Sequence, residues 1–243
     1  DTSAPTTCTV SSISESSSYA YSSGTTIYYN TAVTGNFTVN ASSTDAQSGI
    51  EKVNFPTTVS AGADDSSSPY ALGYTWATDD TFSTTTEITC YNNASDTSTS
   101  SFTVTRDVTD PSGGSITYTD GSQSSTSVSL TVADGTDAGS GLDTSTRIIK
   151  RQSATLTSGS CGSFGSLSDI TASTTGTYPN FTDPTVTTGN CYKYTYAISD
   201  NVSNEVTYTS VNEIGIDTSA PTTCTVSSIS ESSSYAYSSG TTI

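Results

Sequence analysis

The sequence repeats itself over a long interval: residues 217–243 are identical to residues 1–27, without one substitution. This copy sets the repeat unit at 216 residues, because position 217 restates position 1. We therefore expect one unit followed by the start of the next, as in a window cut from a tandem array. Ile27 continues directly into Tyr28, so we expect Ile243 to be followed by the rest of a further unit.

Within the unit, three short landmarks occur twice in the same order. They divide it into two related modules, residues 1–106 and residues 107–216, each long enough for one domain. The N-terminal module has extra residues before its second landmark, and the C-terminal module has extra residues after it. The paired landmarks are residues 1–5 and 107–111, residues 44–50 and 136–142, and residues 94–96 and 198–200.

Apolar and polar residues alternate along many short segments, as in Phe37, Val39 and Ala41. A period of two with one polar side predicts half-buried antiparallel strands, and no segment has the pattern of an amphipathic helix. We expect an all-β chain of tandem Ig-like antiparallel β-sandwiches, two per 216-residue unit, with a small barrel as the alternative. The predicted strands lie near residues 6–10, 36–41, 50–55, 70–77, 85–91, 101–105, 115–119, 127–132, 145–150, 191–198 and 205–210.

Charge and composition exclude several kinds of partner. Ser and Thr supply 99 of 243 residues, so hydroxyl groups rather than ions keep the surface wet. Six Lys and Arg against 23 Asp and Glu give a net charge of −17, which argues against binding to nucleic acid or to anionic membranes. No apolar run approaches the roughly 18 residues that a membrane helix needs, so no membrane insertion is expected.

The cysteines form an even set once the repeated segment is set aside, because Cys224 restates Cys8. With one pair per module, the sequence predicts disulfides Cys8–Cys90 and Cys161–Cys191. Disulfides imply an oxidising, extracellular location. The absence of His and of C-x-x-C spacing makes a zinc site improbable.

Nothing in the sequence supports catalysis. Without His there is no Ser-His or Cys-His pair to activate a nucleophile, so we expect no enzyme activity. Trp76 and the Tyr-rich segments are compatible with a surface that stacks on sugars. Their alternating placement favours packing in the core, because aromatic side chains bury large areas.

A metal site is weighed at two places. Asp107 and Asp110 flank the internal module boundary, and carboxylates in such linkers bind Ca²⁺ when enough of them converge. The corresponding position in the next unit is Ala220 rather than a second acid. We therefore expect no metal or cofactor, with Ca²⁺ at Asp107 and Asp110 as the alternative. Asp45 and Asp137 are interpreted as turn residues that bond nearby backbone N–H groups.

Five N-x-S/T sequons make covalent glycans candidates on exposed positions. In a chain this rich in Ser and Thr, chance alone produces roughly four or five sequons, so their number carries no weight. Asn36 and Asn40 share the polar face of one predicted strand, where glycans would not disturb the core. The candidates are Asn36, Asn40, Asn93, Asn180 and Asn201.

The motifs D-T-S-A-P, T-D-A-x-S-G-[I/L] and S-D-N-V-S-N, in this order, resemble the bacterial Ig-like repeat modules of giant secreted and cell-surface proteins. The resemblance covers residues 1–216 and departs from the family at Ser203, where Gly is usual. It implies a structural repeat of an extracellular fibre or surface-adhesin stalk, without catalysis. Its partners would be other copies of the repeat. The alternative is a carbohydrate- or surface-binding module displayed on such a stalk.

Overall fold

The computed structural model describes residues 1–230, 232 and 234–242. The predicted repeat copy at 217–243 therefore includes positions 231, 233 and 243, which lie outside the described residues. Apart from one 3-10 turn, η1 (Thr171–Ser173), the regular elements are strands, and the predicted all-β class is confirmed. Among the described residues, no helix has the length and apolar character needed to span a bilayer.

The N-terminal module contains two sheets around one apolar core. A three-stranded sheet has the order β1-β4-β7, and a six-stranded sheet has the order β2-β3-β9-β8-β5-β6. Both sheets contribute inward-facing side chains, so the core lies between them. The strands are β1 (Thr7–Glu15), β2 (Ala20–Ser23), β3 (Thr26–Tyr29), β4 (Gly35–Thr44), β5 (Ile50–Phe55), β6 (Ala63–Asp65), β7 (Tyr70–Trp76), β8 (Thr84–Asn92) and β9 (Thr97–Arg106).

The C-terminal module also has two sheets and a core of its own. One sheet has the order β10-β12-β17-β16; the other has the order β11-β20-β18-β13-β14, with β15 on β13 and β19 on β18. The strands are β10 (Ser115–Thr117), β11 (Gly121–Gln123), β12 (Val128–Ala133), β13 (Leu142–Thr157), β14 (Ser160–Cys161), β15 (Ser168–Asp169), β16 (Thr175–Thr177), β17 (Asn180–Asp183), β18 (Asn190–Asp200), β19 (Glu205–Thr209) and β20 (Ile214–Ile216).

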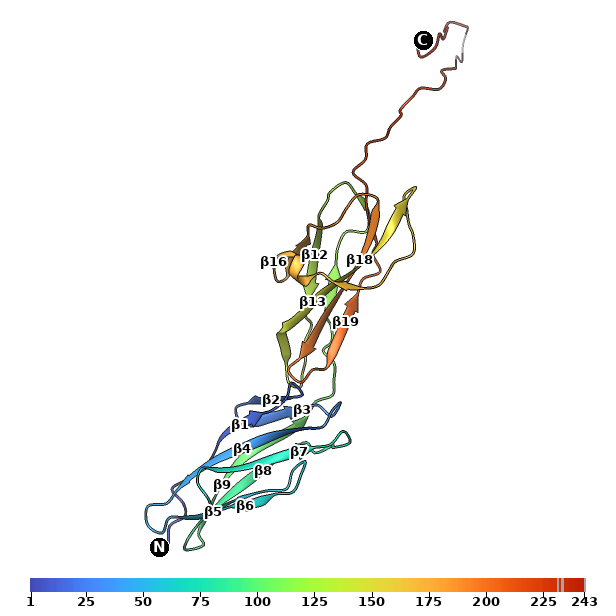
Figure 1. Ribbon diagram of the computed structural model, residues 1–243. Coiled ribbons are helices and arrows are strands. Elements are labelled where there is room, and N and C mark those ends of the chain that lie inside the picture. The colour runs from blue at the N-terminus through green and yellow to red at the C-terminus, as the bar shows by residue number, and fades with distance from the viewer. Residues whose placement is uncertain (231, 233, 243) are drawn as a thin grey trace.

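The two modules follow one another along the long axis of the molecule, with the N-terminus at one end (Figure 1). The segment after β20 extends beyond the other end. No sheet pairs strands of the two modules within the described residues. Contact between the modules is therefore left to loops and turns at their facing ends.

Each predicted strand is present, but the expectation of purely antiparallel pairing is wrong. β3 runs parallel to β9, and β11 runs parallel to β20. β20 carries no alternation, because all three of its residues are buried. Period two cannot identify a strand that is covered on both faces.

The repeated segment adopts different structures in its two positions. Residues 1–27 supply β1, β2 and the start of β3, whereas the described part of 217–243 has one isolated bridge, Ser239–Thr242. β1 pairs with β4, and β3 pairs with β9. Neither β4 nor β9 is restated in 217–243, whereas the Ser23–Thr26 pair of the β2–β3 hairpin recurs there as the Ser239–Thr242 bridge.

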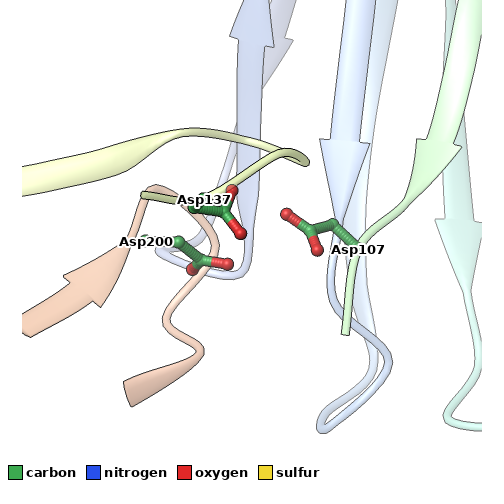
Figure 2. A group of neighbouring side chains, drawn as sticks. All are labelled: Asp107, Asp137 and Asp200. Atoms are coloured by element: carbon green, nitrogen blue, oxygen red, sulfur yellow. The ribbon is translucent and has the colours of Figure 1, made fainter. Parts of the chain in front are cut away.

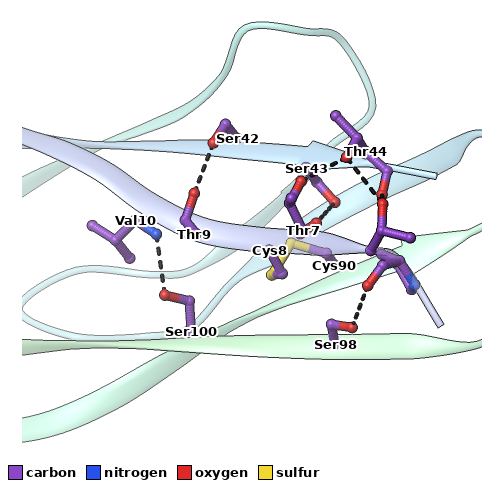
Figure 3. The surroundings of a disulfide bond; sticks show 12 residues. Thr7, Cys8, Thr9, Val10, Ser42, Ser43, Thr44, Cys90, Ser98 and Ser100 are labelled. Carbon is purple, nitrogen blue, oxygen red and sulfur yellow. Dashed lines mark hydrogen bonds between the residues drawn. A yellow bond between two sulfur atoms is a disulfide. The ribbon is translucent and has the colours of Figure 1, made fainter. Parts of the chain in front are cut away.

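The structure pairs Cys8 with Cys90 and Cys161 with Cys191, as the sequence predicts. The first bridge joins β1 of the three-stranded sheet to β8 of the six-stranded sheet, with a Cα–Cα distance of 5.9 Å. Beside it, Ser100 and Ser98 of β9 bond to the chain around β1 (Figure 3). Covalent and polar links therefore close the N-terminal module at the same place. Cys224 is exposed and unpaired.

Two acidic residues are neutralised inside the C-terminal module. Asp134 accepts from Arg147 Nε, which lies 3.0 Å from Oδ1 and 3.2 Å from Oδ2, and also from Arg147 Nη2 and from the Tyr196 hydroxyl. Asp183, which is fully buried, accepts from Arg151 at 2.6 Å and from Tyr194 at 3.0 Å. Burial favours the neutral acid, but Arg147 and Tyr196 outweigh it at Asp134, and the Thr185 hydroxyl and N–H together with Arg151 outweigh it at Asp183, so the pKa of each carboxyl lies below its usual value. Both carboxylates are therefore hydrogen-bonded by side chains of their own module.

Candidate functional site at the junction of the two modules

The facing ends of the modules meet through buried polar groups. The side-chain amide of Asn30, which is 2% exposed, donates to Val202 O at 3.0 Å and to Asn204 Oδ1 at 2.7 Å. The Ser203 hydroxyl donates back to Ser18 O at 2.8 Å. Buried amides and carbonyls without partners are costly, so these bonds fix how the two ends match.

The extra length of the N-terminal module builds its side of this junction. β2 and β3 form an antiparallel hairpin. Ser18 lies just before this hairpin and Asn30 just after it. Trp76 Nε1 donates to Asn30 O at 3.1 Å and to Val33 O at 2.9 Å, so the loop that carries Asn30 is bonded to the module core.

Three carboxylates converge beside this interface. Asp107 directly follows β9, Asp137 lies in the turn between β12 and β13, and Asp200 ends β18. Each contributes an oxygen, and these oxygens lie within 4.8 Å of one another. Figure 2 shows the three side chains directed toward a common space. Asp107, the first residue after the N-terminal module, is thereby brought against two turns of the C-terminal module.

Backbone N–H groups orient the three carboxylates. Asp107 Oδ2 accepts from Ser140 N at 2.7 Å, and Asp137 Oδ2 accepts from Gly141 N at 2.7 Å. Gly139 lets Asp107 come this close, because a Cβ there would lie 2.3 Å from Asp107 Oδ2. The turn residue predicted at 137 is therefore confirmed as one that bonds the backbone.

Asp200 is held by its own turn. Its Oδ1 accepts from Val202 N at 2.9 Å and Asn204 N at 2.8 Å, and its Oδ2 accepts from Asn204 Nδ2 at 2.6 Å. The residue is 2% exposed. Burial raises the pKa of Asp200 above its usual value, and the negative charge of Asp107 raises it further.

Positive charge is scarce around this cluster. Each salt bridge found among the described residues uses an acid other than Asp107, Asp137 or Asp200. The hydroxyl of Ser140, whose N–H contacts Asp107, is buried and has no hydrogen-bond partner. Buried hydroxyls without a partner are uncommon in folded proteins, and this one belongs to a residue whose N–H bonds a carboxylate of the cluster.

The N-terminal module has a counterpart of this cluster at Asp1, Asp45 and Asn92. Asn92 Oδ1 accepts from Ala94 N at 3.0 Å and Asp96 N at 2.8 Å. Asp200 holds its own turn in the same way, so Asn92 and Asp200 are equivalent. The alignment of residues 94–96 with residues 198–200 is therefore wrong by four residues; 92–96 matches 200–204. Aligning the shared Ser-Asp dipeptides shifted the two turns relative to each other.

Amide chemistry closes the N-terminal counterpart. Asn92 Nδ2 donates to Asp1 Oδ2 at 3.2 Å and to Asp45 Oδ2 at 3.3 Å. The Ser48 hydroxyl, equivalent to that of Ser140, donates to Asp1 Oδ2 at 2.7 Å. Burial alone raises the pKa of Asp45, but the Ser48 N–H and the Asn92 amide outweigh it and bring the pKa below its usual value.

The sequence named Asp107 and Asp110 as an alternative Ca²⁺ site, and the structure places only one of these two residues in the cluster. Asp107 belongs to the cluster, whereas Asp110 is exposed and lies outside it. Sequence reasoning missed Asp200 as its partner and interpreted Asp137 as a turn residue alone. The sequence did contain a signal for this cluster. Asp137 and Asp200 both belong to landmarks that recur in the two modules, and the landmarks of one module lie together at one end of that module.

The sequons fall into two groups. The amide nitrogens of Asn93 and Asn201 donate to backbone carbonyls, Ser48 O at 2.7 Å and Ser140 O at 2.8 Å respectively. These two sequons therefore anchor the turns that carry the clusters. The other three candidates lie on strands: Asn36 and Asn40 on β4 and Asn180 on β17.

The aromatic side chains are mainly core residues, as their spacing predicts. Trp76 is 2% exposed, and Tyr74 and Tyr196 are fully buried. Within residues 1–216, Tyr178 is the most exposed aromatic at 43%, and the Arg147 guanidinium covers its ring at 4.0 Å. Residues 1–216 therefore show no exposed cluster of aromatic rings of the kind that stacks on sugars.

Comparison with known proteins adds little. No family model matches the sequence, and no curated protein matches it. Among solved structures, the fibronectin(III)-like modules of CbhA from Clostridium thermocellum align with a TM-score of 0.33 and 10% identity. That alignment covers 78% of this chain and 88% of the other. A likeness at this level assigns neither a family nor a function to the chain.

Proposed function

We propose that the chain is a structural, non-catalytic repeat of an extracellular fibre or surface-adhesin stalk. Each 216-residue unit contributes two Ig-like β-sandwiches, residues 1–106 and 107–216, and residues 217–243 begin the next unit. The observation that carries this proposal is the unsubstituted copy of residues 1–27, which form strands where their partners are present. In an array, the following residues would supply those partners to 217–243.

The placement of the chain ends supports end-to-end stacking. The N-terminus and the segment after β20 lie at opposite ends of the molecule (Figure 1), so successive units extend the same axis. The disulfides and the excess of acidic residues fit an oxidising, extracellular setting in which the surfaces of neighbouring fibres repel.

Electron microscopy of native material tests the fibre. Sandwiches of this size advance about 35–45 Å each along the axis, so a two-module unit predicts an axial repeat of about 70–90 Å, shorter where modules tilt. Unbranched fibres with that periodicity support the proposal. Globular particles one unit in size would contradict it.

The junction cluster gives the repeat a binding chemistry. We propose that Asp107, Asp137 and Asp200 hold one divalent cation of the Ca²⁺ type, which takes six to eight oxygen ligands. The buried Ser140 hydroxyl and the close approach of Asp107 at Gly139 fit such an ion. The ion would offset the mutual repulsion of the carboxylates and anchor the linker, while the disulfide-bonded cores keep their own packing.

Calorimetric titration of the chain with CaCl₂ tests this site. We expect saturable binding that is lost in Asp137→Asn. Asp110→Asn removes the same charge from an exposed residue outside the cluster and is the matched control. Binding that survives Asp137→Asn and is lost in Asp110→Asn would move the site back to the linker and contradict the assignment.

A further inference from the structure

The two junction clusters have the same number of acids in a different arrangement. Four equivalent positions read Asp1, Asp45, Asn92 and Asp96 in the N-terminal module. In the C-terminal module they read Asp, Asp, Asp and Asn, at residues 107, 137, 200 and 204. An Asn and an Asp have exchanged places, so overall composition hides the difference.

That exchange changes one atom at the centre of the cluster. The Oδ1 atoms of Asn92 and Asp200 accept the same pair of turn N–H groups, at 2.8–3.0 Å. The remaining atom is a nitrogen in Asn92 and an oxygen in Asp200. The Asn92 nitrogen donates to Ser3 O, Asp1 and Asp45. The Asp200 oxygen accepts from Asn204 Nδ2 at 2.6 Å and adds a third acidic group beside Asp107 and Asp137.

The neighbouring hydroxyls follow the same division. Ser48 donates to Asp1 at 2.7 Å, while the equivalent hydroxyl of Ser140 is buried without a partner. In the N-terminal cluster an amide and a hydroxyl bond to Asp1, whereas in the C-terminal cluster three carboxylates converge and the Ser140 hydroxyl has no partner.

We infer that the side-chain amide of Asn92 replaces the cation in the N-terminal module, so that cation-independent and cation-dependent linker anchors alternate along the array. This inference rests on the proposed cation at Asp200. Its consequence is that removing divalent ions releases every second linker and leaves the others held by Asn92. The residue equivalent to 92 and 200 thereby decides which junctions respond to ions.

A reciprocal exchange tests the inference by calorimetric titration with CaCl₂. The test uses the full chain with an acetylated N-terminus, so that the α-ammonium group of Asp1 adds no charge. We expect one ion per wild-type chain, none for Asp200→Asn and two for Asn92→Asp. Asp110→Asn is the matched control: it removes an exposed acid that lies outside both clusters, and one ion should remain.

Melting curves protect the test against a variant that folds poorly. Asn92→Asp is expected to melt below wild type in EDTA and to regain most of the difference in CaCl₂. One ion in both wild type and Asn92→Asp, without recovery in CaCl₂, would overturn the alternation and leave the cation site intact. No ion in wild type would instead remove the proposed cation itself.

Discussion

The side-chain amide of Asn30 donates across the module boundary to the side-chain carbonyl of Asn204, at 2.7 Å. Asn204 in turn holds Asp200 at 2.6 Å, so the junction and the carboxylate cluster share a residue. Any change that loosens the cluster therefore acts on the contact between modules. The predictions below follow from this connection and from the packing of each module.

Asn30→Ala should weaken the coupling of the modules by about 1–3 kcal/mol, because it leaves buried acceptors on Val202 and Asn204 without a donor. Trp76 is the one tryptophan of the chain, and its Nε1 contacts Asn30 O, so urea unfolding followed by its fluorescence reports this junction. Asn36→Ala, on the exposed face of β4, is the control and should change little. Equal midpoints for both variants would show that the junction bond contributes nothing.

Stability should depend on pH through Asp200. Its folded-state pKa is raised, so wild type binds the extra proton below that value and loses stability as pH rises through it. In EDTA, the free energy of unfolding of Asp200→Asn should therefore increase relative to that of wild type as pH rises above about 4, the ordinary pKa range of Asp. The lowered pKa values of Asp134 and Asp183 act equally in both chains and cancel.

Denaturant midpoints of the two chains, measured from acid to neutral pH, check this sign. Saturating CaCl₂ should reverse the order at neutral pH, because only wild type can bind the ion. A difference between the chains that is constant with pH would contradict the assignment of the titrating group.

Removing each disulfide should cost a different amount. The bridges close loops with sequence separations of 82 and 30 residues. The chain-entropy relation then gives about 4.5 and about 3.6 kcal/mol. We expect the Cys8→Ala/Cys90→Ala pair to lower the unfolding free energy more than the Cys161→Ala/Cys191→Ala pair, because Cys90 and Cys191 are both fully buried and the loop lengths differ. Urea titrations of both double variants measure this, and the opposite order would refute it.

Ser95 has φ of +68°, a left-handed conformation that disfavours residues with a Cβ. Ser95→Gly should therefore stabilise the N-terminal module by about 0.5 kcal/mol, after the entropic cost of glycine. Ser101→Gly, on β9, should destabilise it by about 0.5–1 kcal/mol. Thermal melting compares the two, and destabilisation by both would show that the turn does not gain from glycine.

Glycans, where present on native material, should occupy sequons whose amide nitrogen is not already a donor. Asn36 and Asn180 use their side-chain oxygens as acceptors. Asn93 and Asn201 use their nitrogens to hold turns. Peptide mass mapping before and after deglycosylation should find the first pair modified and the second pair bare, and full occupancy of Asn201 would contradict the structural role.

The strands can be predicted from the sequence because they depend on local alternation, and the disulfides can be predicted because each module has one cysteine pair. The junction between the modules cannot be predicted in this way. Asp107 and Asp200 are 93 positions apart, and no local spacing reveals that they meet. Ser203 stands where the related modules usually have glycine, and its φ of +68° shows that the backbone there has the left-handed conformation that glycine favours.

The alignment error arose for a physical reason. The turn is defined by the residue whose Oδ1 caps it, and Asn and Asp serve equally well in that role. The identity of that residue is free to change, so Asn92 and Asp200 did not look alike in sequence. The same freedom lets one module carry an amide and the other a carboxylate.

Gel electrophoresis of the native material, denatured and fully reduced, tests the tandem array most directly. If the unsubstituted copy of residues 1–27 at 217–243 joins successive units through the peptide chain, the protein should migrate far above the 24.9 kDa of this chain. A single sharp band near that mass would contradict the account, because units of one length would then assemble without covalent continuity.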